Sequence, residues 1–167
     1  ILFELSPGSA AGLLPAISAG ATAPDEPDTD NDLLPDSWEL HWFGNLLAAT
    51  AESDSDADGF TARAEYIAGT DPVNAVLGLS LHARRNLVNL ELSFVSRGTD
   101  AIGYQHAARH YQIETAVSAR PQTVWSPVPG FSDLLAPPGA ETMTCVVPLE
   151  SGVTRFYRLR VWLQQAP

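Results

Sequence analysis

The sequence contains no lysine and a single cysteine, and it has nine basic residues against twenty acidic ones. Proteins bind phosphate backbones through clustered Lys and Arg, so a net charge of −11 argues against nucleic acid as a partner. One cysteine, Cys145, excludes a disulfide within the chain. No apolar run approaches the roughly 18 residues of a spanning helix, so we expect no membrane span.

Catalytic motifs are also missing. There is no Gly-x-Ser-x-Gly turn, no phosphate loop and no Cys/His pairing with the spacing of a known enzyme family. His106 and His110 have the spacing of zinc ligands on a helix, but no third ligand lies nearby in the sequence. Cys145 falls on the apolar face of a strand pattern, which favours a core position over a nucleophile. We predict that the protein is not an enzyme.

The first position is isoleucine, and no basic segment precedes an apolar one. We therefore expect a processed or excised mature chain. The 167 residues, 45% of them hydrophobic, are enough for one domain or for a small module joined to a larger one.

Negative charge is concentrated in the first half of the chain. Residues 1–75 hold fourteen acidic residues and one arginine, a net charge of −13, whereas residues 76–167 carry a net charge of +2. This asymmetry indicates cation binding within one segment rather than a general solubilising effect.

The acidic stretch at residues 54–65 has the spacing of a calcium loop and reads DSDADGFTARAE. Calcium takes six to eight oxygen ligands, and a twelve-residue loop supplies them from alternate side chains, a carbonyl at the seventh place and a glutamate at the twelfth. Gly59 occupies the sixth place, where the chain turns sharply. The predicted ligands are Asp54, Asp56, Asp58, the carbonyl of Phe60, and Glu65.

A second acidic stretch, at residues 28–39, keeps nearly the same spacing and reads DTDNDLLPDSWE. Here the ninth place is also acidic, but Leu33 stands where glycine is expected, and a branched residue would be strained if the turn needs a positive φ. The predicted ligands are Asp28, Asp30, Asp32, the carbonyl of Leu34, Asp36 and Glu39. We therefore expect two Ca²⁺ sites, the second loop fitting the pattern better. The alternative is a solvated acidic linker.

Each loop is followed by a short helical pattern, residues 36–47 and 61–69, with Trp38 and Trp42 on the apolar face of the first. The two loops with these helices resemble the paired thrombospondin type-3-like calcium repeats of secreted bacterial proteins. The motifs that carry the resemblance read DTDNDLLPDSWELHWFGNL and DSDADGFTARAEYIAGTDP. The closing RFYRLRV and the middle YQIETAV resemble strands of the β-sandwich that often follows such repeats. The resemblance implies an extracellular module made rigid by calcium.

Residues 76–167 alternate apolar and polar side chains in about six runs separated by Gly, Pro and Asn. This spacing is typical of a small antiparallel Ig-like β-sandwich. One predicted strand places Val88, Leu90, Leu92 and Phe94 on a common face. The expected fold is therefore mainly β, with a small calcium module of loops and helices at residues 25–75 and a sandwich at residues 76–167.

Residues 1–24 are rich in Ala, Gly and Pro, which excludes a long helix and leaves short extended pieces such as 1–5 and 13–18. Such a segment becomes ordered by docking on its own sandwich or on the open sheet edge of a neighbouring subunit. Head-to-tail docking of the second kind generates an open fibre.

Two functions fit these features. The first is a non-enzymatic extracellular structural protein, a subunit that assembles with its own copies into a bacterial surface filament or matrix through its N-terminal strand. The second is the C-terminal accessory module of a larger secreted enzyme or adhesin, which attaches it to a cell-surface glycan through Trp125 or Trp162.

Overall fold

The computed structural model describes residues 3–4, 16–17, 26–76, 78–120 and 123–165. Its two helices are α1 (Asp36–Trp42) and α2 (Ala62–Ala68). Its longer strands are β3 (His82–Arg85), β4 (Asn89–Arg97), β5 (Ala107–Ala116), β8 (Ala140–Pro148) and β9 (Phe156–Gln165). Four strands of two residues complete the set: β1 (Phe3–Glu4), β2 (Ala16–Ile17), β6 (Ser126–Pro127) and β7 (Leu134–Leu135).

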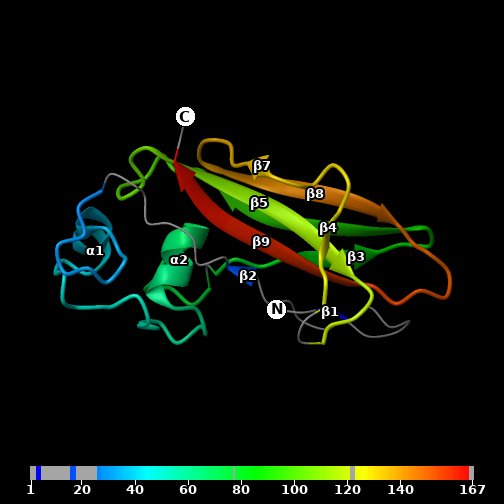
Figure 1. The fold of residues 1–167 in the computed structure, drawn as a ribbon, viewed down its shortest axis with the longest axis horizontal. Coiled ribbons are helices and arrows are strands. Elements are labelled where there is room, and N and C mark those ends of the chain that lie inside the picture. Colours follow the sequence, from blue (N-terminus) through cyan, green and yellow to red (C-terminus); the bar gives the residue numbers. More distant parts are fainter. Residues whose placement is uncertain (1–2, 5–15, 18–25, 77, 121–122, 166–167) are drawn as a thin grey trace.

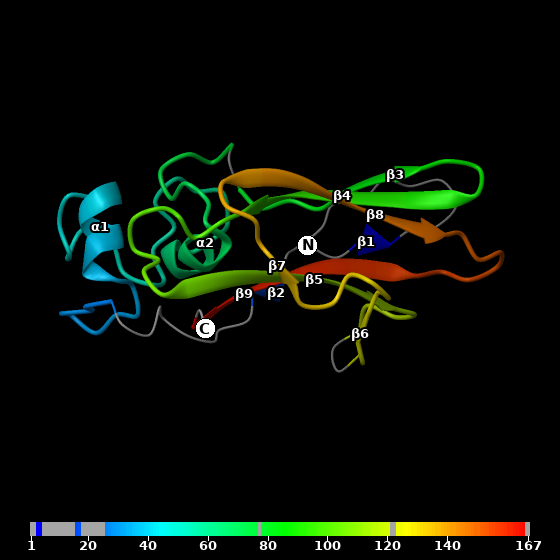
Figure 2. The same ribbon diagram turned by 90° about the horizontal axis from the view of Figure 1, so that it is seen from above.

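The strands form two sheets that face each other (Figure 2). Sheet A has the order β1-β9-β5-β6, with β2 also on β9 and β7 also on β5, and sheet B has the order β3-β4-β8. All pairings are antiparallel except that of β2 with β9. The predicted mainly-β fold with antiparallel sheets is therefore confirmed, and the two facing sheets are consistent with a sandwich.

Alternation along the strands produces the layer between the sheets. In β4, Leu90, Leu92 and Phe94 are buried on one face, and Phe94 contacts Tyr111 of sheet A with 5.0 Å between ring centroids. Val88, predicted on this same face, is 66% exposed and precedes the strand. The prediction was wrong there because Asn86 accepts hydrogen bonds from the backbone N–H groups of Val88 and Asn89, which closes a turn before β4 begins.

All six predicted strand regions contain a strand, while β7 was not predicted. The two extended pieces predicted near the N-terminus contain β1 and β2, and the rest of residues 1–24 lies outside the described residues. Both helices lie at one end of the sheets, so the molecule is elongated, with the acidic module at one end and the β3–β4 hairpin at the other (Figure 1).

Candidate calcium centres

Each acidic loop brings three carboxylates together. Asp28, Asp30 and Asp32 each offer an oxygen within 4.8 Å of the others, and Asp54, Asp56 and Asp58 do the same. Three negative charges at this distance repel one another unless a cation lies among them, so either triad could hold a metal ion.

The two loops have the same backbone conformation. The N–H group of the sixth residue donates to the first aspartate at 3.1 Å in both loops, Leu33 to Asp28 and Gly59 to Asp54. The N–H of the ninth residue donates to the carbonyl just before the loop in both, at 2.8 and 2.6 Å. The spacing common to both stretches therefore corresponds to a common structure.

The sixth place of both loops has a positive φ, 79° at Leu33 and 93° at Gly59. This is the left-handed region, which costs residues other than glycine about 1–2 kcal/mol. The expectation that Leu33 would be strained in a turn of this kind is confirmed. The chain nevertheless adopts the turn, because the carboxylates of Asp28 and Asp32 accept the N–H groups of Leu33 and Leu34.

The glutamate at the twelfth place of the first loop is fully buried. Glu39 lies in α1 with 0% exposure, and neither of its carboxylate oxygens has a hydrogen-bond partner among the described residues. Burial, followed by the charges of Asp32 and Asp30, raises the pKa of Glu39 to about 7. A buried carboxylate without a partner costs several kcal/mol when ionised, and coordination to a cation would remove that cost.

Glu65 repeats this arrangement in α2. It is 1% exposed; Oε1 accepts a hydrogen bond from the Thr70 hydroxyl at 3.3 Å, and Oε2 has no partner among the described residues. Burial and the charges of Asp56 and Asp58 raise the pKa of Glu65 to about 8. In both loops the glutamate lies close to the aspartates of the same loop. Without a cation, burial and these negative charges therefore disfavour the ionised form of the glutamate.

The remaining predicted ligands differ between the loops. Leu34 is fully buried and Phe60 is half-buried, so the carbonyls proposed at the seventh place belong to residues anchored by their side chains. The structure does not bring Asp36 into the first triad. Its two oxygens accept hydrogen bonds from the N–H and hydroxyl of Thr29, which lowers its pKa.

Hydrogen bonds join the two loops to each other. The second oxygen of Asp32 accepts the N–H of Ala51, a residue just before the second loop, at 2.9 Å. Arg63, in the second helix, donates to the carbonyl of Leu33 at 3.3 Å. A ligand of one loop is thus fixed by the segment leading into the other, so the loops form one unit.

Sequence reasoning missed the residue that attaches this unit to the sandwich. Arg109 of β5 is 1% exposed, and its guanidinium donates to the carbonyls of Ile67 (2.7 Å) and Tyr66 (3.3 Å) at the end of α2. It also donates to the carbonyls of Arg97 and Gly98 at 2.9 and 2.5 Å. A buried arginine whose partners are backbone carbonyls leaves no charge pattern in the sequence.

Of the histidines and tryptophans singled out in the sequence, His110 and Trp162 pair across β5 and β9 of sheet A, whereas Trp38 and Trp42 belong to α1. His106 lies in the turn before β5, and Trp125 directly precedes β6. His110 pairs with Asp133 at 2.7 Å and stacks on Trp162. Arg158 lies 4.4 Å from the ring centroid of Trp125, and Arg160 lies 5.6 Å from that of Trp162. These cationic contacts cover part of the ring surface that stacking on a sugar would need.

The structure and the comparisons add two negative findings. Among the described residues, no helix has the length and apolarity needed to cross a membrane. Comparison of the chain with protein-family models, curated proteins and solved structures finds no match in any of the three.

Proposed function

We propose that residues 25–75 are a pair of thrombospondin type-3-like calcium repeats that bind two Ca²⁺ ions and make this end of the molecule rigid. The observation that carries the proposal is the pair of buried glutamates, Glu39 and Glu65, beside three aspartates each. Both oxygens of Glu39 and one of Glu65 have no hydrogen-bond partner in the part of the chain that the structure describes. Calcium is favoured over magnesium because so many carboxylates in a flexible loop suit a large cation with many oxygen ligands.

Isothermal titration calorimetry of the full chain tests this step. We expect two Ca²⁺ ions per chain, with dissociation constants of about 10⁻⁴–10⁻³ M, as is common for extracellular modules. Asp58→Asn should remove one site and Asp32→Asn the other, while Asp100→Asn, which changes an exposed carboxylate in the sandwich, should leave both. Absence of heat at millimolar calcium would refute the proposal.

We further propose that the protein is a non-enzymatic structural subunit of an extracellular bacterial filament, in which the sandwich forms the body and the N-terminal segment joins successive copies. The support is the position of β1 and β2, which both lie on the outer edge of β9. Among the described residues, their pairings involve four residues of β9, a strand of ten. An edge strand with unpaired backbone groups is a template for a strand from another chain.

An element that docks on its own domain through few contacts can make the same contacts with a neighbour, which is the basis of strand exchange. Negative-stain electron microscopy of the full chain with and without a chelator tests for such polymers. We expect filaments in calcium and none after deletion of residues 1–24. Filaments formed by the deletion variant would show that the N-terminal segment is not the link.

A further inference from the structure

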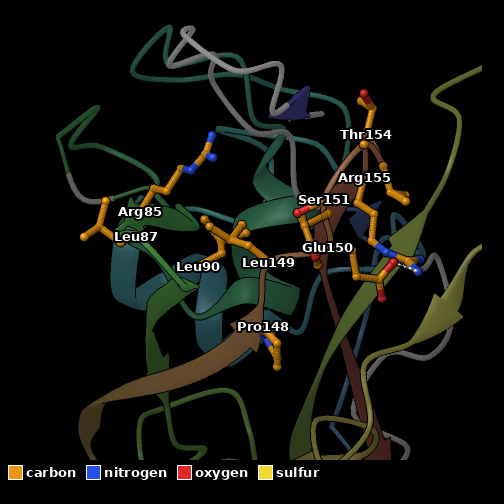
Figure 3. A pocket seen from close by; sticks show the side chains of 12 residues that line it. Arg85, Leu87, Leu90, Pro148, Leu149, Glu150, Ser151, Thr154 and Arg155 are labelled. Atoms are coloured by element: carbon orange, nitrogen blue, oxygen red, sulfur yellow. Dashed lines mark hydrogen bonds and ion pairs between the residues drawn. The ribbon is translucent and has the colours of Figure 1, made fainter.

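A pocket of about 340 Å³ opens at the end of the sandwich opposite the calcium module. Its walls come from the β3–β4 hairpin, the end of β8, the β8–β9 loop and Tyr157 at the start of β9 (Figure 3). Pockets that enclose a ligand commonly have volumes from about 300 Å³ upward, so this pocket is large enough to take up side chains of another molecule.

The pocket has both polar and apolar walls, and its apolar side continues onto an exposed apolar surface. Leu90 is 1% exposed and Leu149 packs against the core, so these side chains form fixed walls. Leu87 and Val153 also line it and are 99% and 45% exposed. Large apolar side chains gathered around a pocket indicate a surface that another chain covers.

Two arginines and one glutamate lie at the rim of the pocket. Arg85 and Arg155 lie on opposite sides of the pocket (Figure 3), and Arg155 pairs with Glu150 at 2.8 Å. Arg85 has no ion pair with a described residue, and the neighbouring Arg84 and His82 are exposed as well. An occupant with apolar side chains and acidic groups would match this end of the sandwich.

The pocket also adjoins the edge of β9. Tyr157 lines the pocket and is the residue of β9 that pairs with Phe3 of β1. A strand added to this edge therefore runs beside the mouth of the pocket. Main-chain hydrogen bonds along an edge together with side-chain pockets beside it are the two components of recognition by strand addition.

We propose that this pocket is the receptor for the N-terminal segment of a second copy of the chain. The inference rests on the proposed assembly through strand exchange and specifies where the donated segment is held. The segment has the required chemistry, because residues 1–5 are apolar except for Glu4. The acidic residues 25–75 follow after residues 6–24, so docking tethers the most negative part of one copy near the end of the next that carries Arg85 and Arg155.

Photo-crosslinking of full-length chains tests the proposal. Heavy-isotope-labelled protein in which benzoylphenylalanine replaces Phe3 is mixed with unlabelled wild-type protein, calcium is added, and the products are identified by mass spectrometry. We expect links from position 3 of heavy chains to residues 85–90 or 148–157 of light chains. Links confined to heavy chains, or links to light chains only at other residues, would overturn the inference.

A matched pair of variants tests the pocket itself. Leu87→Asp in the light chain changes an exposed leucine of the pocket, and Leu47→Asp changes a leucine that is 79% exposed in the calcium module. We expect Leu87→Asp to lower the yield of heavy-to-light links about tenfold, the effect of losing one buried leucine. Leu47→Asp should leave the yield unchanged. Equal yields for the two variants would overturn the role of the pocket.

The results also separate this inference from the proposed filament. Filaments that persist while the cross-links fall elsewhere would refute the pocket and leave the assembly intact. Links to the pocket between two chains without filaments would support the pocket and refute the extended polymer.

Discussion

Replacing Glu65 by glutamine should stabilise the calcium-free protein and weaken the stabilisation that calcium provides. Without calcium, the fold buries a carboxylate whose pKa is raised to about 8. A raised pKa means that the folded state binds the proton more tightly than the unfolded state does. The penalty therefore begins above the ordinary pKa of 4.5 and is nearly complete at about 8.

The size of the effect follows from that shift. At about 1.4 kcal/mol per pKa unit, burying the ionised side chain costs the calcium-free protein on the order of 5 kcal/mol. Glu65→Gln removes the charge and keeps an oxygen for the hydroxyl of Thr70. In a chelator at alkaline pH, we expect the variant to unfold at a higher temperature than the wild type.

With calcium, the difference between the variant and the wild type should narrow. An ion at about 100 times its dissociation constant stabilises the folded state by about 2.7 kcal/mol. In a chain of this size each kcal/mol corresponds to about 2–4 °C, so each site should raise the melting temperature by about 5–11 °C. The Glu65→Gln variant should lose the rise in melting temperature that calcium at the second site produces and keep the rise from the first site.

Thermal unfolding followed by circular dichroism, in chelator and in excess calcium, measures both effects. Glu52→Gln is the matched control, because Glu52 is an exposed glutamate of the same module outside both loops. It should leave both melting temperatures unchanged. If Glu65→Gln destabilises the protein equally in both conditions, or keeps the full response to calcium, then Glu65 is a structural side chain and our assignment of the site is wrong.

Three further predictions concern other parts of the molecule. Leu33→Gly should stabilise the protein by about 1 kcal/mol in urea unfolding because it relieves a positive φ at a half-exposed side chain; a loss of stability would contradict this. In chelator, the urea midpoint should fall as the pH rises from about 5 to about 8, because Glu39 and Glu65 ionise while buried, and calcium should abolish the fall; a flat profile in chelator would contradict the burial. Arg109→Met should cost at least about 3 kcal/mol because four backbone carbonyls lose a charged donor, whereas the exposed Arg120→Met should cost nothing measurable.

The sheets could be predicted from the sequence where side chains alternate strictly. Leu90, Leu92 and Phe94 specify the inner face of β4, and their burial confirms the pattern. The strand β7 could not be predicted, because its two residues show no alternation and it exists only through pairing with β5. Strand pairing over so short a length is decided by tertiary contacts rather than by local sequence.

The acidic triads were also predictable, because ligand spacing within one loop is a local property. Glu39 and Glu65 each occupy the twelfth place of a loop, which is also the fourth residue of the helix that follows. The side chain at this place lies on the buried side of the first helical turn. Arg109 was beyond this kind of reasoning, because its acceptors at Tyr66 and Ile67 lie more than forty residues earlier in the chain. Only when α2 lies against sheet A do these carbonyls reach Arg109, so that its guanidinium is buried and hydrogen-bonded rather than solvated.

Helix α2 connects the second acidic loop to the sandwich, so an ion bound in that loop would act on the sandwich through this helix. It carries Glu65, and its Tyr66 stacks on Tyr104 at 4.9 Å while donating to the carbonyl of Gly103 at 3.0 Å. Arg109 holds the end of the same helix and lies over the ring of Tyr104, 4.6 Å from its centroid. An ion that fixes Glu65 thereby fixes the helix whose other side is bonded to sheet A. In the proposed filament, calcium would therefore control how firmly each acidic module is held to its own sandwich, and chelation should make the joint flexible before the sheets unfold.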